Sequence, residues 1–291
     1  LWLPFHEELL HSIGSNKSVK FPLPKEWRLA LADQKIKVNN LCCAFFWFGF
    51  VFLSWGQGLI QFFKSILYLM RDTKIVGRHI SLYYIKENCL PLNPTGKNLV
   101  NWYKVWENNK AIEAITHSVP HVSDFQHDHL KIVYTDGLPK LSGAALIKYI
   151  FNGLYLSVMS IILLLFRPYF ALMLGERIKL NRVNLADSES LAEDYLFNNS
   201  GLFYRPIWTY SAEKKGSRIL FYFYSVNNEP FKTKEGYTVS HPWHLASWPH
   251  YLVWDQTQEN FLRRSNSFRS VIENVGVIWF SSVKQHISFP K

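Results

Sequence analysis

The chain has 291 residues, 16% of them aromatic, with a formal net charge of +10 and an isoelectric point near 9.4. A basic surface favours anionic partners, but the Lys and Arg residues are scattered and no zinc-finger, RRM or KH pattern occurs, which argues against nucleic acid as a partner. Cys42, Cys43 and Cys89 make neither a disulfide framework nor a zinc quartet, so a reducing compartment is expected. The chain starts without Met and ends just after a strand-like run, and we expect it to be truncated.

Two apolar segments are long enough to cross a membrane. Residues 41–63 carry no formal charge, and residues 149–166 lie between Lys148 and Arg167. Three interpretations stay open: spanning helices, helices lying in the membrane interface with Trp47 and Trp55 as anchors, and buried helices of a soluble protein. Basic residues flank both segments on both sides, so the charge pattern does not decide the orientation.

The other segments are taken in chain order. Residues 1–40 are expected to be irregular or helical, and residues 41–70 form the first apolar helix. Residues 71–140 predict a small α/β layer with a strand at "HISLYYIK", a helix over "LVNWYKVWENNKAIEAI" and a strand at "LKIVYTDG". Residues 141–175 hold the second apolar helix, and residues 167–187 read as a linker-like helix and strand.

A histidine-rich stretch, "HSVPHVSDFQHDHL", lies within residues 71–140 and contains His117, His121, His127 and His129. Histidine and carboxylate clusters can bind zinc or iron. The stretch has no HExxH pattern and no HxxxH on a clear helix, so it favours a polar loop, and no metal site is predicted.

Residues 176–291 alternate strands and helices and predict a parallel sheet covered on both faces. Strands are expected at Leu196 and Phe197, over "RILFYFYS", over "YLVW" and over residues 275–280, with helices after Pro206 and after Asp255. In such sheets, ligands bind beyond the carboxyl ends of the strands. Those ends carry "NNSG", "SVNN" and "WDQ", which indicates a binding cleft.

The candidate site residues follow from this cleft. Asn199 and Ser200 lie at a strand-to-helix turn where exposed amides can hold an anion or a sugar hydroxyl, and Arg205 beside them could contact a phosphate. Ser225 and Asn227 follow the next strand, where a simple turn is the plainer explanation. His244, within "HPWHLASWPH", could serve as a general base or a metal ligand, although the two Trp-Pro pairs of this stretch favour a rigid aromatic turn, and Asp255 at a helix start is a natural cap.

The pieces "YRPIWTYSAEKKGSRILFYFYSVN", "WPHYLVWDQTQENFLRR" and "VGVIWF" resemble the N-terminal Rossmann half of a GT-B type glycosyltransferase. More narrowly, the region 188–280 is similar to bacterial polysaccharide-biosynthesis proteins of the PFTS-motif family. The PFTS letters themselves do not occur, because the chain ends at "SFPK". The fold expected is therefore a Rossmann-like parallel sheet, the N-terminal half of a GT-B arrangement, with added apolar helices.

This resemblance implies a glycosyltransferase of surface polysaccharide biosynthesis, at the inner, cytoplasmic face of the cell membrane. A nucleotide sugar would be the donor substrate, bound mainly by a second domain, and no cofactor is expected in this chain. The acceptor would be a lipid-linked glycan, and the membrane surface would be a partner. A general base would be expected near a strand end of this domain, with His244 and Asp255 as the candidates. Two alternatives stay open: a non-catalytic, membrane-associated component of polysaccharide assembly or export, and a polyol-phosphate transferase.

Overall fold

A computed structural model describes residues 2–71, 78–92, 98–107, 112–198, 204–223, 232–233, 236–237, 246–265 and 270–278. The chain divides into two compact units. Unit 1 comprises residues 1–67 and 147–178, and unit 2 comprises residues 68–146 and 179–291. Unit 2 therefore continues on both sides of the second segment of unit 1.

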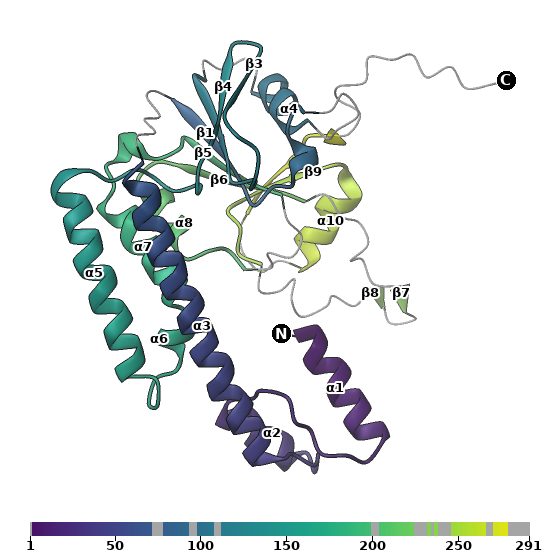
Figure 1. The fold of residues 1–291 in the computed structure, drawn as a ribbon. Helices are drawn as coiled ribbons and strands as arrows, with labels where there is room; N and C mark the ends of the chain where they lie inside the picture. The colour runs from purple at the N-terminus through teal and green to yellow at the C-terminus, as the bar shows by residue number, and fades with distance from the viewer. Residues whose placement is uncertain are drawn as a thin grey trace. The chain divides into compact units, whose positions relative to one another are not determined.

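Unit 1 is helical and contains both apolar segments (Figure 1). Its helices are α1 (Trp2–Gly14), α2 (Lys25–Asp33), α3 (Asn40–Leu69), α5 (Gly143–Ile162), α6 (Tyr169–Leu172) and α7 (Leu174–Leu185), of which α3, α5 and α7 continue into unit 2. Helices α3 and α5 confirm the two predicted apolar helices. Both pass a length and hydropathy test for membrane spans, and little of either span is buried.

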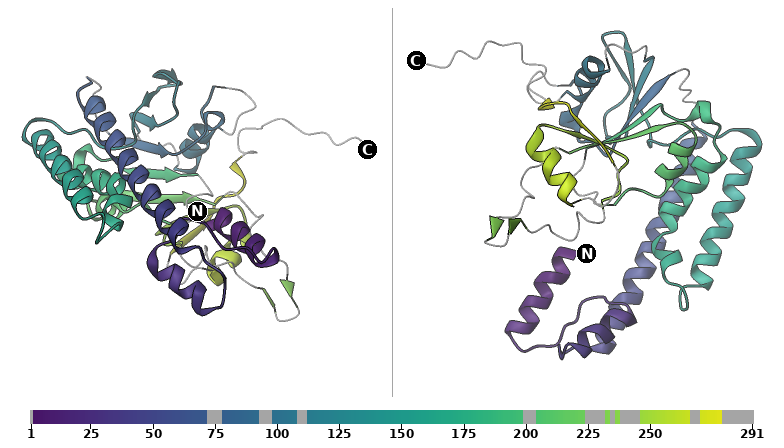
Figure 2. Two further views of the ribbon diagram at one scale, coloured as in Figure 1. Left: turned by 60° about the horizontal axis from the view of Figure 1, so that its bottom comes forward. Right: turned by 180° about the vertical axis from the view of Figure 1, so that it is seen from behind.

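Close contact between α3 and α5 depends on a glycine. A Cβ atom on Gly153 of α5 would lie 2.1 Å from the Phe62 ring of α3, and the Phe62 ring also contacts Tyr149. Two turns further along, the Trp55 Nε1–H donates to the Ser157 carbonyl at 3.1 Å. The contacts run in opposite directions along the two helices, so α3 and α5 are antiparallel, as Figure 2 also shows.

Unit 2 is built on a sheet of eight strands in the order β10-β9-β6-β5-β1-β2-β4-β3. The strands are β1 (His79–Tyr83), β2 (Ala114–His117), β3 (Phe125–His127), β4 (Leu130–Tyr134), β5 (Asp194–Phe197), β6 (Arg218–Tyr222), β9 (His250–Val253) and β10 (Val271–Asn274). All pair in parallel except β3, which runs antiparallel to β4. A separate antiparallel pair joins β7 (Lys232–Thr233) to β8 (Gly236–Tyr237).

The parallel strands are ordered as in a doubly wound Rossmann sheet. From β1 the chain builds outward through β2 and β4, then returns to the other side of β1 and builds outward through β5, β6, β9 and β10. This is the Rossmann strand order, with the direction of winding reversed between β1 and β5. The prediction of a Rossmann-like parallel sheet is confirmed, and residues 71–140 and 176–291 contribute to the same sheet.

Each face of the sheet carries its own apolar core. On one face, Ile80, Ile115 and Leu196 pack with residues of α4 (Leu99–Trp106). On the other, Tyr195 and Phe221 pack with residues of α7, α8 (Trp208–Lys214) and α10 (Gln256–Ser265). Helices on both faces explain why the central strands are buried along their whole length.

Four local predictions were wrong. The helix expected over residues 99–115 ends at Trp106, and Ala114 and Ile115 belong to β2, because that segment pairs with β1. Residues 275–278, the described part of the strand expected over 275–280, form no strand, and the last strand among the described residues is β10, a half-exposed edge strand that needs no apolar run. Residues 167–187 contain α6 and α7 and no strand, and the expected histidine-rich loop contains β3.

Candidate functional site

The switch point of the sheet lies between β1 and β5, where neighbouring strands lead to opposite halves of the fold. A crevice outside the carboxyl ends of the strands is expected there, because the connections from β1 and β5 diverge. The residues that follow these strands are Tyr84, with a positive φ of 55°, and Asn198. This edge is the candidate binding site.

Asn198 is held at the switch point by the segment that follows β1. Its Nδ2 lies 3.8 Å from the Sγ of Cys89, which closes a short 3-10 turn, Glu87–Cys89. The Asn198 side-chain oxygen is shielded from solvent and has no hydrogen-bond partner among the described residues. A buried acceptor without a partner costs about 1–3 kcal/mol, so this oxygen is suited to accept a hydrogen bond from a ligand hydroxyl.

Two further buried polar atoms follow strands at the same edge. Gln258, three residues beyond the Asp255 that follows β9, is 2% exposed, and its Nε2 has no partner among the described residues. At the end of β2, His117 is fully buried, and its Nδ1 accepts from the Val119 N–H. The Nε2, for which the described part of the chain offers no partner, therefore carries the proton. One strand, β6, lies between β5 and β9, and one strand, β1, lies between β5 and β2. The carboxyl ends of β9 and β2 are therefore each about 10 Å from that of β5.

Asp255, one of the two candidates for a general base, follows β9 at this edge. Its Oδ1 accepts from the Gln258 N–H at 3.0 Å, which confirms that it caps α10. The Gln258 Oε1 in turn accepts from the Trp254 N–H at 2.7 Å, so this turn is held from both directions. Asp255 is exposed, and a role as a base stays a prediction.

Arg205, the predicted phosphate contact, is bound within its own segment. Its guanidinium donates to Thr209 Oγ1 and to Glu213, and it stacks 4.0 Å from the centre of the Tyr210 ring. These contacts fix the start of α8 and explain why Arg205 is buried. The other predicted site residues lie outside the described residues: Asn199, Ser200, Ser225, Asn227 and His244.

Arg182 of α7 is a fully buried cation on the β4 side of this edge. It forms an ion pair with Asp136, which follows β4. The Nε–H also donates to the Pro139 carbonyl at 2.7 Å, and Nη2 donates to the Leu138 carbonyl at 3.1 Å. The guanidinium thus ties α7 to the loop after β4, a role that explains its burial without a ligand.

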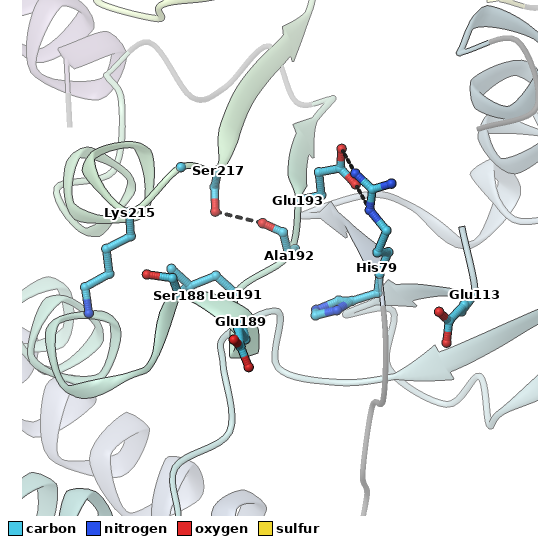
Figure 3. A pocket seen from close by; sticks show the side chains of 11 residues that line it. His79, Glu113, Ser188, Glu189, Leu191, Ala192, Glu193, Lys215 and Ser217 are labelled. Atoms are coloured by element: carbon cyan, nitrogen blue, oxygen red, sulfur yellow. Dashed lines mark hydrogen bonds and ion pairs between the residues drawn. The ribbon is translucent and has the colours of Figure 1, made fainter. Parts of the chain in front are cut away.

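A hollow of about 600 Å³ lies at the opposite edge, among the amino ends of β1, β2, β5 and β6 (Figure 3). Several of its polar groups are paired within the protein. Arg78 forms an ion pair with Glu193, the Ser217 hydroxyl donates to the Ala192 carbonyl at 2.7 Å, and the Lys215 ammonium donates to the Val183 and Asn184 carbonyls at the end of α7. Charges paired in this way favour a structural role for this edge.

Sequence reasoning missed Asn198, Gln258 and His117 as site residues. The signal available was the position of Asn198 directly after an apolar strand, in the same "NNSG" turn that was considered. The burial of Gln258 and His117 follows from the α10 turn and from the β2–β4 pairing, which no local pattern reveals. Among the described residues, no group of three or more His, Cys, Asp or Glu side chains is arranged to hold a metal ion.

The strand order and the edge at its switch point define a Rossmann-like α/β protein. Residues 155–291, slightly less than half of the chain, match the family model described as polysaccharide biosynthesis PFTS motif protein. This match relates the chain to polysaccharide biosynthesis and agrees with the resemblance seen in the sequence. No curated protein and no solved structure matches the chain significantly.

Proposed function

We propose that this protein transfers a sugar from a nucleotide-sugar donor to a lipid-linked glycan acceptor during bacterial surface polysaccharide biosynthesis, at the cytoplasmic face of the cell membrane. One observation carries the proposal. The region that matches the polysaccharide-biosynthesis family, residues 155–291, contributes β5, β6, β9 and β10, whose carboxyl ends form one side of the candidate crevice.

The polar groups at this edge suit a glycan. Sugar hydroxyls both donate and accept hydrogen bonds. The atoms left without a partner by the described residues offer an acceptor at Asn198 Oδ1 and a donor at Gln258 Nε2. By the GT-B resemblance this domain takes the acceptor, whereas the donor nucleotide sits mainly on a second Rossmann domain.

In the proposed step, a carboxylate or imidazole takes the proton of the acceptor hydroxyl, and the oxygen of that hydroxyl attacks the anomeric carbon of the donor sugar. The bond between that carbon and the donor phosphate breaks, and the nucleotide leaves with the bonding electron pair. Asp255 is one candidate base, because it is exposed and follows β9 at the crevice edge. His244 is the other, by its place in the sequence.

The experiment is a transfer assay with the full-length protein, a panel of UDP-, GDP-, CMP- and dTDP-sugars and an extract of lipid-linked acceptors. Transfer of one sugar is expected. Absence of transfer across the whole panel, from protein shown to be folded, would overturn the proposal.

A second candidate function is a non-catalytic, membrane-associated component of polysaccharide assembly or export. The exposed apolar faces of α3 and α5 favour this function, because a membrane-associated component can act through these faces without an active site. Cells that carry Asn198→Ala and Asp255→Ser together separate the two functions. Normal polysaccharide in these cells, with its loss on gene deletion, supports the non-catalytic component.

A further inference from the structure

Helices α3 and α5 expose large apolar side chains along most of their length. On α3, Leu41, Phe45 and Leu53 are 84%, 76% and 67% exposed. On α5, Phe151 and Tyr155 are 68% and 64% exposed. The exposed face continues past the end of α5 through Leu165, Phe166 and Tyr169. Soluble proteins rarely leave so large a continuous apolar surface in water.

The dimensions of this face match a lipid bilayer. Residues 41–63 are helical and uncharged, and at 1.5 Å per residue they extend about 34 Å. The hydrocarbon layer of a membrane is about 30 Å thick. Lys35, Lys37 and Lys64 flank this stretch, and Lys148 and Arg167 flank the apolar part of α5, all of them exposed. Lysine and arginine at such ends suit anionic lipid headgroups.

The charge pattern argues against a second copy of the chain as the partner. Residues 34–67 and 147–175 contain no Asp or Glu. A symmetric contact through this face would bring the same basic residues from both copies into one interface without a carboxylate to pair with them. A bilayer imposes no such cost.

The path of the chain determines how α5 can enter a bilayer. Strand β4 precedes α5 and strand β5 follows α7, and both belong to one sheet. The segment between these two strands must therefore leave the sheet and return to it. Within unit 1 the return is visible: Leu164 and Ala171 pack with Val51 of α3, and the start of α7 lies against Gly58, whose added Cβ would be 2.9 Å from Leu174 Cβ. The rear view in Figure 2 shows this reversal after α5.

We propose that unit 1 is inserted in the membrane through α3 and α5, and that residues 147–178 form a re-entrant hairpin that enters and leaves the bilayer on the same side. This inference deepens the membrane part of the proposed function. It does not depend on sugar transfer, so its tests need no substrate.

The first test measures membrane retention. Membranes from cells that express the full chain are extracted with alkaline carbonate, and the retained fraction is compared between two matched double variants. Leu53→Glu with Tyr155→Glu changes the proposed lipid face, whereas Val105→Glu with Val271→Glu changes residues of unit 2 that are 69% and 60% exposed. We expect at least a threefold loss of retention for the first pair and none for the second. Extraction of the wild type, or equal retention of both pairs, overturns the proposal.

The second test measures immersion directly and does not depend on how the glutamate variants fold. A nitroxide is attached at Val158→Cys, midway along the apolar residues 149–166, and separately at Gln256→Cys on α10, with the chain in vesicles of phosphatidylethanolamine and phosphatidylglycerol. Cys42, Cys43 and Cys89 are replaced by Ala in both. Oxygen should relax the Val158 label more than a water-soluble nickel complex does, with the opposite order at Gln256. A Val158 label that favours nickel, or spin coupling between two copies, contradicts lipid contact.

Discussion

Asp194 and Arg218 lie side by side as the first residues of the parallel strands β5 and β6, and the guanidinium donates to both carboxylate oxygens. The Tyr103 hydroxyl of α4 donates to the same carboxylate, and Glu107 accepts from Arg218. Burial and the Asp194 charge together raise the pKa of Tyr103, so its hydroxyl stays a donor at neutral pH. The cluster fixes α4 to the amino ends of β5, which borders the switch point, and of β6 beside it.

Replacement of Asp194 by Ala should strongly destabilise unit 2. The substitution leaves the Tyr103 hydroxyl and part of Arg218 without a partner in a buried place, and breaking such a pair costs about 3–5 kcal/mol. The side chain of Arg218 is 40% exposed, which places the expected loss toward the lower end of that range. Urea unfolding measures it. Arg263→Ala, which breaks the exposed pair with Glu259, is the control and should cost less than about 0.5 kcal/mol.

Stability should fall as the pH is lowered from about 6.5 to about 4. Burial lowers the pKa of His117 to about 4, from its usual 6.5. Between these values the unfolded chain binds a proton that the folded chain excludes, so acid favours unfolding by up to about 3 kcal/mol. Urea unfolding across this pH range measures the slope. His117→Asn keeps an acceptor for the Val119 N–H and should flatten the curve, with a residual slope from His250, whose pKa burial also lowers. An unchanged slope in this variant refutes the assignment.

Gly153→Ala should weaken the contact between α3 and α5. The new methyl group would overlap the Phe62 ring, and overpacking of this kind costs about 1–3 kcal/mol. The melting temperature in detergent should fall, and Phe62→Leu should restore part of it by making room. Gly56→Ala is the matched control, because no atom lies within 4 Å of the added Cβ. Equal melting temperatures for the two alanine variants would exclude the contact.

Asp255 offers a clean separation of capping from catalysis. Asp255→Ala should cost roughly 1 kcal/mol of stability, because the Gln258 N–H loses its acceptor. Serine at the same position caps a helix but cannot serve as a base near neutral pH. Asp255→Ser should therefore keep the melting temperature and lose at least a hundredfold in transfer rate. Full transfer by the serine variant removes Asp255 from the list of bases.

Much of the sheet could be predicted because most of its strands have a recognisable local sequence pattern. The apolar runs at β1, β5, β6 and β9 end in turn residues, and Asp255 carries the cap signal for α10. Strand β10 gave no such signal. Its "VIEN" sequence is half polar, and only its pairing with β9 makes it a strand.

The site was less predictable than the fold. Burial leaves polar atoms of His117, Asn198 and Gln258 without a partner within the described ranges, and burial depends on strands and helices that are far apart in sequence. Arg205 shows the converse. Its place beside a polar turn suggested a ligand, whereas Thr209 and Glu213, four and eight residues later, take up its hydrogen bonds.

The insertion of α5, α6 and α7 between β4 and β5 also governs the order of assembly. Strand β1 pairs with β5 across more than a hundred residues, from Ile80 to Asp194, and contacts so distant in sequence form slowly. During synthesis the strands β1, β2 and β4 are made first. The edge of β1 that later pairs with β5 stays unpaired while the apolar helices are synthesised. The two halves of the sheet can pair only after β5 has been synthesised. The segment that contains α5, α6 and α7 is therefore complete before the sheet is.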